Sequence, residues 1–442
     1  MRARLRHLYR MAGDTFWILP GAMVVGGILL AVGLVSMDRS GVVPRWLIDS
    51  PWLYNGGGTG ARTLLGAVAS STIGVAGTVF SITIASLSLA AGQMGPRLLR
   101  NFVQDRGNQF TLGAFLGTFS YALMVLRSVR TEDEGPFVPY LSLNIGIGFA
   151  FLCVGTLVFF VGHMAGRINV DTVIELVSDD VGRAVRRLTV EDAQPAAPSE
   201  TFWAGAIPVR DHRRGYLQQL DGDGLATWAA HRNCSIRLLA RPGSYIFPGT
   251  PVAMLRGRAD GVEGAIRDAT VLGAERVSSA DLEFAVRQLV EVAVRALSPG
   301  INDPHTAVGV LDRLGAALCD VAPRHLPSGV WLGNGEPSLV VPAVDYDGLV
   351  DAMFHEIRQN AAGDVSVLAR MIEVMTAVLG VERRTERIGA LDRHAALVVA
   401  DAERDIANPA DLEDVRARHR AFDRLRLEHL ADEAGGHRAP TS

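Results

Sequence analysis

The chain has 442 residues, of which 48% are hydrophobic and 20% are charged, and its mean hydropathy is +0.20. This composition is too apolar for an ordinary soluble protein. The formal net charge of −4 argues against a nucleic-acid-binding protein, since such proteins carry a strong basic excess. The three cysteines are far apart in the sequence and form neither a disulfide framework nor a CxxC metal motif.

Lysine is absent from the sequence. Without lysine, the chain can form no Schiff base, no Walker-type phosphate site and no lipoyl or biotinyl attachment. The pair His355 and Glu356 lacks the second histidine of an HExxH zinc motif. The sequence therefore predicts neither a cofactor nor a metal site.

Four apolar stretches in the first part of the chain are long enough to cross a bilayer. A hydrocarbon core of about 30 Å requires roughly 20 apolar residues in a helix, and none of the four has an acidic or basic residue in its interior. They are Phe16 to Met37, Thr63 to Met94, Phe110 to Leu126 and Phe137 to Gly162. We therefore expect four transmembrane helices in residues 1–167.

Arginines indicate how these spans are oriented. They precede the first span at Arg2, Arg4, Arg6 and Arg10, and they follow the second and fourth spans at Arg97, Arg100, Arg106 and Arg167. By the positive-inside rule, both termini are predicted to be cytoplasmic in a bacterial inner membrane. The polar segment with Arg97 and Arg100 is too short to span the bilayer, and its arginines suit the anionic inner-leaflet surface.

The second span has one face of small, weakly polar residues, which recur at steps of three, four or seven. They are Ser70, Gly74, Gly77, Ser81, Ser88 and Gly92. Close packing against another helix explains this face most simply, because small residues let two backbones approach. The alternative is a pore wall to which each subunit of an oligomer contributes one helix. Gly148, Gly155 and Gly162 of the fourth span are likewise predicted to serve helix packing.

Ionisable residues are confined to the ends of the predicted spans, where His163 and Arg127 lie. Proton-driven carriers and ion pumps usually hold an ionisable residue at membrane depth. A carboxylate-based transporter is therefore disfavoured, and passive conduction, scaffolding or sensing remain.

The rest of the chain is predicted to be a cytoplasmic α+β region. We expect a stalk helix and linker at 168–200, a small β-rich module at 201–262, a helical domain at 263–430 and a disordered tail at 431–442. Short apolar runs separated by Asp-Gly and Pro-Gly turns indicate the β-rich module. Amphipathic stretches indicate the helices. The predicted fold class is an α-helical integral membrane protein with a mostly helical C-terminal α+β domain.

Arginines are frequent in the β-rich module, and Arg213 and Arg214 are adjacent. A solvated surface, or one near anionic lipid headgroups, is the usual explanation. A phosphorylated ligand is the alternative, because the guanidinium fork suits phosphate, although no phosphate-cradling loop accompanies these arginines.

The stretch "RALSPGINDPHTA" separates two amphipathic helical patterns. Its polar and helix-breaking residues are Ser298, Pro299, Gly300, Asn302, Asp303, Pro304 and His305. We expect a tight corner between two helices, in which Asn302 or Asp303 caps the second helix and Pro304 takes its first position. The rival interpretation makes Asn302, Asp303 and His305 ligands or catalysts, but a metal site usually needs a third or fourth side chain at characteristic spacing.

Several segments resemble an uncharacterised bacterial family of predicted inner-membrane proteins, known as a domain of unknown function. The resembling stretches are "GDTFWILPG", "FSITIASLSLAAGQMGPRLLRNFVQD", "LGAFLGTFSYALMVLRSVR", "GYLQQLD" and above all "ALSPGINDPHTA". They extend over nearly all of the chain up to about residue 320. The resemblance implies a topology and a location in the membrane, and it assigns no catalytic or binding residue.

The leading functional hypothesis is an oligomeric, channel-like inner-membrane protein that passes a small ion, with a cytoplasmic domain that assembles or gates it. The second is a non-conducting scaffold or sensor that recruits a partner or binds an anionic ligand. The third, ranked last, is a membrane-tethered enzyme that uses Asn302, Asp303 and His305.

Overall fold

The structure is a computed structural model that describes residues 16–40, 53–94, 105–130, 137–167, 170–276, 281–361 and 363–436. The chain divides into two compact units, Met1–Thr172 and Val173–Ser442. Each unit is described by itself.

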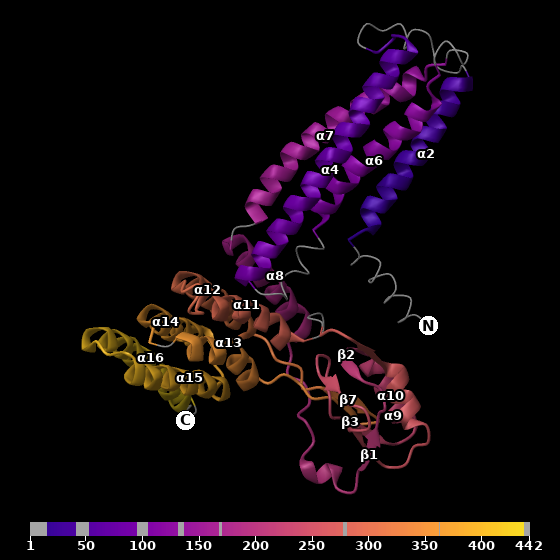
Figure 1. Ribbon diagram of the computed structural model, residues 1–442. Helices are drawn as coiled ribbons and strands as arrows, with labels where there is room; N and C mark the ends of the chain where they lie inside the picture. The colour runs from indigo at the N-terminus through magenta and orange to yellow at the C-terminus, as the bar shows by residue number, and fades with distance from the viewer. Residues whose placement is uncertain are drawn as a thin grey trace. The chain divides into compact units, whose positions relative to one another are not determined.

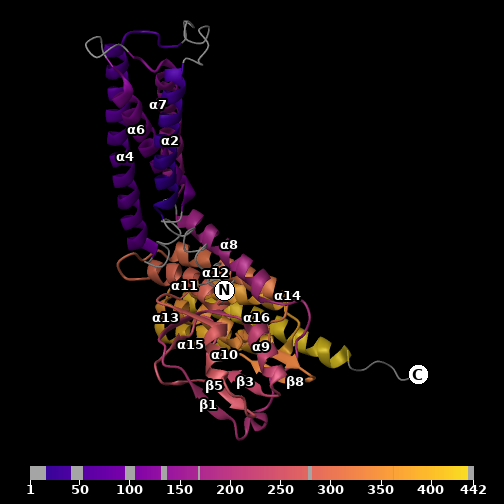
Figure 2. The ribbon, with the colours of Figure 1, turned by 90° about the vertical axis from the view of Figure 1, so that its right-hand side faces the viewer.

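The first unit is a bundle of four long helices, which confirms the four predicted spans. They are α2 (Ile18–Ser40), α4 (Gly58–Met94), α6 (Arg106–Ser128) and α7 (Tyr140–Arg167). Each is long and apolar enough to cross a membrane. Figures 1 and 2 show the four helices side by side. The chain is therefore a multi-pass membrane protein.

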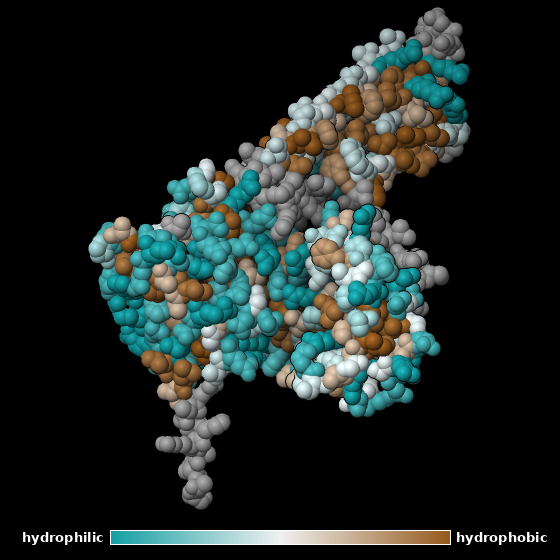
Figure 3. Space-filling model, turned by 60° about the horizontal axis from the view of Figure 1, so that its bottom comes forward, coloured by the Kyte–Doolittle hydropathy of each residue, from teal (hydrophilic) through white to brown (hydrophobic). Residues whose placement is uncertain are grey.

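Helix α6 lies at the centre of this bundle. It packs against α2, α4 and α7, and 61% of its most apolar stretch is buried, against 17% for α2. Glycines permit a close approach here, because a Cβ on Gly27 of α2 would lie 2.6 Å from the carbonyl oxygen of Gly117 in α6. Figure 3 shows apolar side chains on the outside of the bundle, as expected of a surface in contact with lipid.

The second unit begins within α8 (Val170–Leu188), the predicted stalk helix. One face of α8 is apolar and buried, with Val173, Val177 and Val181 in a row. The Ala- and Pro-rich linker that follows is mostly irregular up to the short helix η3 (Glu200–Trp203).

Two small sheets form the β-rich module. The strands are β1 (Ile207–Arg210), β2 (Gly215–Leu220), β3 (Ser235–Leu238), β4 (Tyr245–Ile246), β5 (Pro251–Arg256), β6 (Thr270–Gly273), β7 (Val330–Gly333) and β8 (Glu336–Val340). A five-stranded sheet has the order β1-β5-β3-β8-β7, and a three-stranded sheet has the order β4-β2-β6. Helices α9 (Gly222–His231) and α10 (Val262–Ala269) pack against these strands (Figure 1).

The last two strands join this module from a distant part of the sequence. β8 pairs in parallel with β3, and Ile236 lies opposite Leu339. Both side chains are fully buried in the core that the sheet shares with Leu225 of α9 and Ile266 of α10. Sheet residues therefore occur well beyond the predicted β-rich segment.

The remaining helices form the helical part of the second unit. They are α11 (Leu282–Ala296), α12 (Pro304–Val321), α13 (Tyr346–Ala361), α14 (Val365–Val381), α15 (Thr385–Asp405) and α16 (Pro409–Gly436). Helix α14 packs against α12, α15 and α16, whereas α11 packs against α12 and α13. Helix α16 reaches into the segment predicted to be a disordered tail, because residues such as Ala and Glu favour helix up to the glycine pair at its end. Residues 437–442 lie outside the described part.

Candidate functional site

Helix α4 has two opposite faces. Its buried face contains Ala61, Leu65, Ala69, Thr72, Ala76 and Val79. The small residues predicted to form a separate face, Ser70, Gly74, Gly77, Ser81 and Ser88, are all exposed. At about 100° per residue, the two sets lie on opposite sides of the helix.

The other three described helices of the first unit do not cover this small-residue face. A Cβ added to Gly74 or Gly77 would meet nothing within 4 Å. The hydroxyl of Ser81 is bonded back to the carbonyl of Gly77 (2.9 Å), as serine commonly is within helices. Gly92 lies near the end of the same helix. If this face packs against a helix, that helix is none of the other three described helices of the first unit.

The three spaced glycines of α7 are also exposed. A Cβ on Gly148, Gly155 or Gly162 would meet nothing within 4 Å, so these glycines do not pack against the other described helices of the first unit. Large apolar residues lie beside them, and Phe151 and Val158 are 73% and 71% exposed. The exposed side of α7 is therefore far more apolar than the small-residue face of α4.

Two carboxylates fix opposite ends of the bundle. At one end, Asp38 of α2 accepts hydrogen bonds from the backbone N–H of Leu141 (3.1 Å) and from the N–H (3.0 Å) and hydroxyl (2.6 Å) of Ser142. These donors lie in the first turn of α7, where a negative charge is stabilised by the helix dipole.

At the other end, Asp105 caps α6 by accepting from Gly107 N (2.9 Å) and pairs with His163 of α7 at 2.6 Å. The carboxylate is 4% exposed and the imidazole 21%. The sequence placed His163 near the end of a span, but it gave no sign of this partner, which is far away along the chain.

The "ALSPGINDPHTA" stretch is a helix corner, as predicted. Its backbone folds on itself, with Asn302 N donating to Ser298 O (2.9 Å) and Asp303 N donating to Ala296 O (2.8 Å). Asn302 has a φ of 50°, a left-handed conformation that asparagine tolerates better than most residues. Gly300 does not have a positive φ.

Asp303 is the N-cap of α12, and Pro304 is in the first turn. The Asp303 carboxylate accepts hydrogen bonds from Thr306 N (3.2 Å) and Thr306 Oγ1 (2.6 Å). The bond from the Thr306 hydroxyl is the main cause that holds the pKa of Asp303 below its usual range. Both carboxylate oxygens are thus engaged within one turn of helix.

His305 is exposed on the first turn of α12, and Pro299 is exposed in the corner. Within the described residues, no group of three or more His, Cys, Asp or Glu side chains could hold a metal ion.

The adjacent arginines Arg213 and Arg214 of the β-rich module have different environments. Arg213 donates to both carboxylate oxygens of Asp211 and to the hydroxyl of Thr270 (2.7 Å), so its guanidinium is already occupied. Burial raises the pKa of Asp211, but hydrogen bonds and charge from Arg213 outweigh it, and the pKa lies below its usual range. Arg214 is exposed. Arg97 and Arg100 lie outside the described residues.

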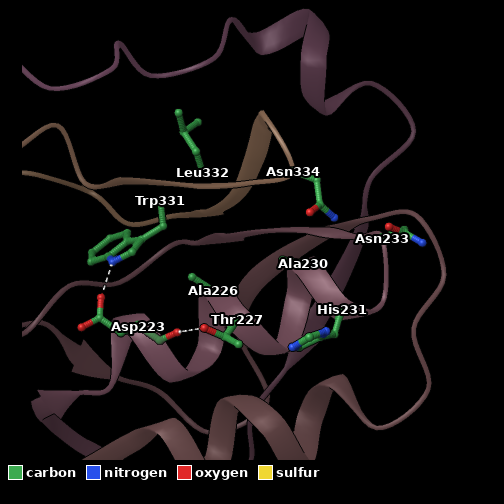
Figure 4. A pocket seen from close by; sticks show the side chains of 9 residues that line it. All are labelled: Asp223, Ala226, Thr227, Ala230, His231, Asn233, Trp331, Leu332 and Asn334. Atoms are coloured by element: carbon green, nitrogen blue, oxygen red, sulfur yellow. Dashed lines mark hydrogen bonds between the residues drawn. The ribbon is translucent and has the colours of Figure 1, made fainter.

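An open pocket of about 400 Å³ lies between α9 and the β7–β8 hairpin (Figure 4). Trp331 bounds one end and donates from Nε1 to Asp223 (2.9 Å), while Asn233 and Asn334 lie at the other end. Thr227 and His231 project from α9 along its floor. The lining offers hydrogen-bond donors and acceptors with little net charge, which suits a small polar molecule. The sequence gave no sign of this pocket, because its walls come from distant segments.

The sequence matches the family described as "Predicted membrane protein (DUF2254)" over residues 13–377. It is 31% identical over 412 residues to an uncharacterized protein of Mycobacterium tuberculosis (strain CDC 1551 / Oshkosh), covering 89% of this chain and 77% of that protein. An uncharacterized protein of Mycobacterium bovis has the same identity and coverage. No solved structure is significantly similar to the chain. This chain therefore belongs to the DUF2254 family of predicted membrane proteins.

Proposed function

We propose that the protein is an oligomeric, channel-like protein of the bacterial inner membrane. Helix α4 of each subunit lines a pathway for a small ion, and the C-terminal unit assembles or gates it. The arginines around the first, second and fourth spans support an orientation with both termini in the cytoplasm.

The small-residue face of α4 carries this proposal. Ser70, Ser81 and Ser88 lie with Gly74 and Gly77 on the side of α4 that points away from the other three helices. Contact with lipid does not explain a row of glycines and hydroxyls, since a lipid-facing helix is best covered by large apolar side chains. Contact with a neighbouring subunit or with an aqueous pathway explains these small and weakly polar residues.

In this proposal, both readings of the face involve more than one copy of the chain. If α4 packs against α4 of a second copy, the glycines let the backbones approach. If several copies of α4 surround a pathway, the serine hydroxyls and the open glycines form its wall. A closed ring with one α4 per subunit satisfies both requirements.

Flux through liposomes tests the proposal. The full chain is reconstituted, and flux of common monovalent and divalent ions is followed with entrapped fluorescent indicators, with and without osmotic stretch. We expect flux that is strongly reduced by Gly77→Leu, because a large side chain would enter the pathway. Val158→Leu is the matched control, since Val158 lies on the exposed apolar side of α7. Absence of flux for every ion, also under stretch, would rule out a channel.

A non-conducting scaffold or sensor is the second candidate, and the pocket between α9 and β7 favours it. A sensor needs a site for a small molecule outside the membrane, and this pocket is lined by Asp223, His231, Asn233 and Asn334. Isolation of the full chain from native membranes distinguishes the candidates, because a stoichiometric partner without any flux supports the scaffold or sensor.

A further inference from the structure

Strand β4 carries aromatic side chains on its outer face. Ile246 is 6% exposed and belongs to the core of the β-rich module, whereas Tyr245 and Phe247 on either side of it are 41% and 60% exposed. Successive side chains of a strand point to opposite faces. Because Ile246 points inward, the two aromatic rings project outward.

The neighbouring strand extends this aromatic surface. Tyr216 of β2 lies opposite Tyr245, and their ring centroids are 5.1 Å apart. The rings of Tyr245 and Phe247 are 5.0 Å apart. Three aromatic side chains therefore form one continuous row, in which Tyr245 and Phe247 are exposed and Tyr216 is half-buried.

Backbone hydrogen bonds place an arginine beside this row. Gly249 N donates to Asp211 O (2.7 Å) and Asp211 N donates to Thr250 O (3.4 Å). These two bonds hold Asp211 beside Gly249 and Thr250. The pairing of β2 with β4 ends with Gly215 opposite Ile246, and the exposed Arg214 and Phe247 directly follow this last pair.

Phe247 is the first residue of a tight turn. Thr250 N donates to Phe247 O (3.2 Å), Pro248 takes the second position of the turn, and Gly249 takes the third with a φ of 78°. These features define a type II turn. The guanidinium of the exposed Arg210 donates to Gly249 O (2.6 Å) and so remains beside it.

The charge of this surface is positive. Asp211, the acidic residue within it, is neutralised by Arg213, and Arg210 and Arg214 are exposed. The resulting aromatic–arginine patch consists of Arg210, Arg214, Tyr216, Tyr245 and Phe247.

We infer that the aromatic–arginine patch docks on anionic phospholipid headgroups of the bilayer that the chain itself spans. Guanidinium groups bind phosphate well, and aromatic rings favour the boundary between headgroups and acyl chains. The four spans keep this bilayer within reach of the second unit at all times, so docking is effectively intramolecular. A protein partner must be recruited from solution and lacks this advantage.

Hydrogen exchange of the full chain in lipid nanodiscs tests the inference. Discs of phosphatidylcholine are compared with discs in which part of the lipid is phosphatidylglycerol. We expect the amides of residues 244–250 to exchange more slowly in the anionic discs, and Arg214→Glu to weaken docking by about fivefold or more, as the attraction of one arginine to an anionic surface predicts. Raising the salt concentration should also reduce the protection, because salt screens the headgroup charge.

Matched variants separate docking from loss of fold. Phe247→Ser should reduce the protection like Arg214→Glu, whereas Arg258→Glu and Leu332→Ser change exposed residues outside the patch and should retain it. Core amides such as that of Ile236 report whether each variant is folded. Equal exchange in both kinds of disc overturns the inference. Protection in both discs that disappears on dilution also overturns it, and would instead indicate contact with a second copy or a protein partner.

Discussion

Asp303 and Thr306 fix the start of α12, because one carboxylate accepts from both the backbone N–H (3.2 Å) and the hydroxyl (2.6 Å) of the same threonine. We expect Asp303→Ala to lower the free energy of unfolding by about 1 kcal/mol, the usual loss for an N-cap. Chemical denaturation of the full chain in detergent measures this change. His305→Ala is the control and should have little effect, since His305 is exposed. A larger loss for His305→Ala than for Asp303→Ala would contradict the assignment of Asp303 as the residue that fixes the start of α12.

Asn302 is the position in this corner where a β-branched residue should be costly. Its φ of 50° is left-handed, and such a conformation costs a residue with a Cβ roughly 1–2 kcal/mol. We expect Asn302→Val to destabilise the protein by about this amount and Asn302→Gly to be tolerated. Gly300→Ala should be nearly neutral, because its φ is not positive and an added Cβ meets nothing within 4 Å. The same denaturation experiment ranks the three variants, and the reverse order would contradict this account.

Adjacent glycines in α2 provide a controlled test of the bundle. A Cβ on Gly27 would lie 2.6 Å from Gly117 O, whereas a Cβ on Gly26 would meet nothing within 4 Å. Gly27→Ala must move α2 away from α6 and should cost about 1–3 kcal/mol, as overpacking typically does. Gly26→Ala should be neutral or slightly stabilising in a helix. Thermal unfolding in detergent compares them, and equal melting temperatures would show that α2 and α6 do not cross here.

His394 predicts how the stability of the second unit depends on pH. Its side chain is fully buried on α15, and Nε2 lies 2.7 Å from Asp351. Burial lowers the pKa of His394, and the hydrogen bond to Asp351 only partly offsets this effect. Positive charge on Arg393 and the nearby His355 acts in the same direction as burial.

The lowered pKa of His394 determines whether the stability of the second unit rises or falls with pH. The unfolded chain binds a proton near the ordinary histidine pKa of about 6.5, while the folded chain does not, so stability is full above this pH and falls as the pH drops from there toward the folded pKa. His394→Gln should remove this part of the pH dependence. Denaturation between about pH 5 and 8, which brackets the ordinary histidine pKa, checks the prediction, and an unchanged slope in the variant would refute it.

Local patterns in the sequence predicted the elements well. The spans follow from long apolar runs, and the corner follows from the residue types that cap and break helices. Helix α11 is amphipathic, as the pattern before the corner indicated, and its apolar residues Leu282, Val286 and Leu289 are buried. In each case, the physical cause lies within a few residues of the feature.

Contacts between distant segments could not be predicted in the same way. The Asp105–His163 pair, the parallel pairing of β8 with β3 and the pocket beneath Trp331 each join segments that are far apart in the sequence. The direction of the small-residue face of α4 was also undetermined, because periodicity shows which residues share a face but not what that face contacts.

Disulfide trapping tests whether the small-residue face of α4 meets another copy of the chain. In a background with Cys319→Ser, which removes the natural cysteine that is not buried, we expect oxidised membranes to contain cross-linked dimers of the Ser81→Cys variant. A disulfide requires the two Cβ atoms to approach within about 4 Å, so cross-linking reports that two copies of α4 face each other. Val158→Cys, on the apolar side of α7, is the matched control and should remain monomeric on a denaturing gel. If Val158→Cys cross-links and Ser81→Cys does not, two copies of α4 do not face each other at Ser81, and the contact between copies forms through α7.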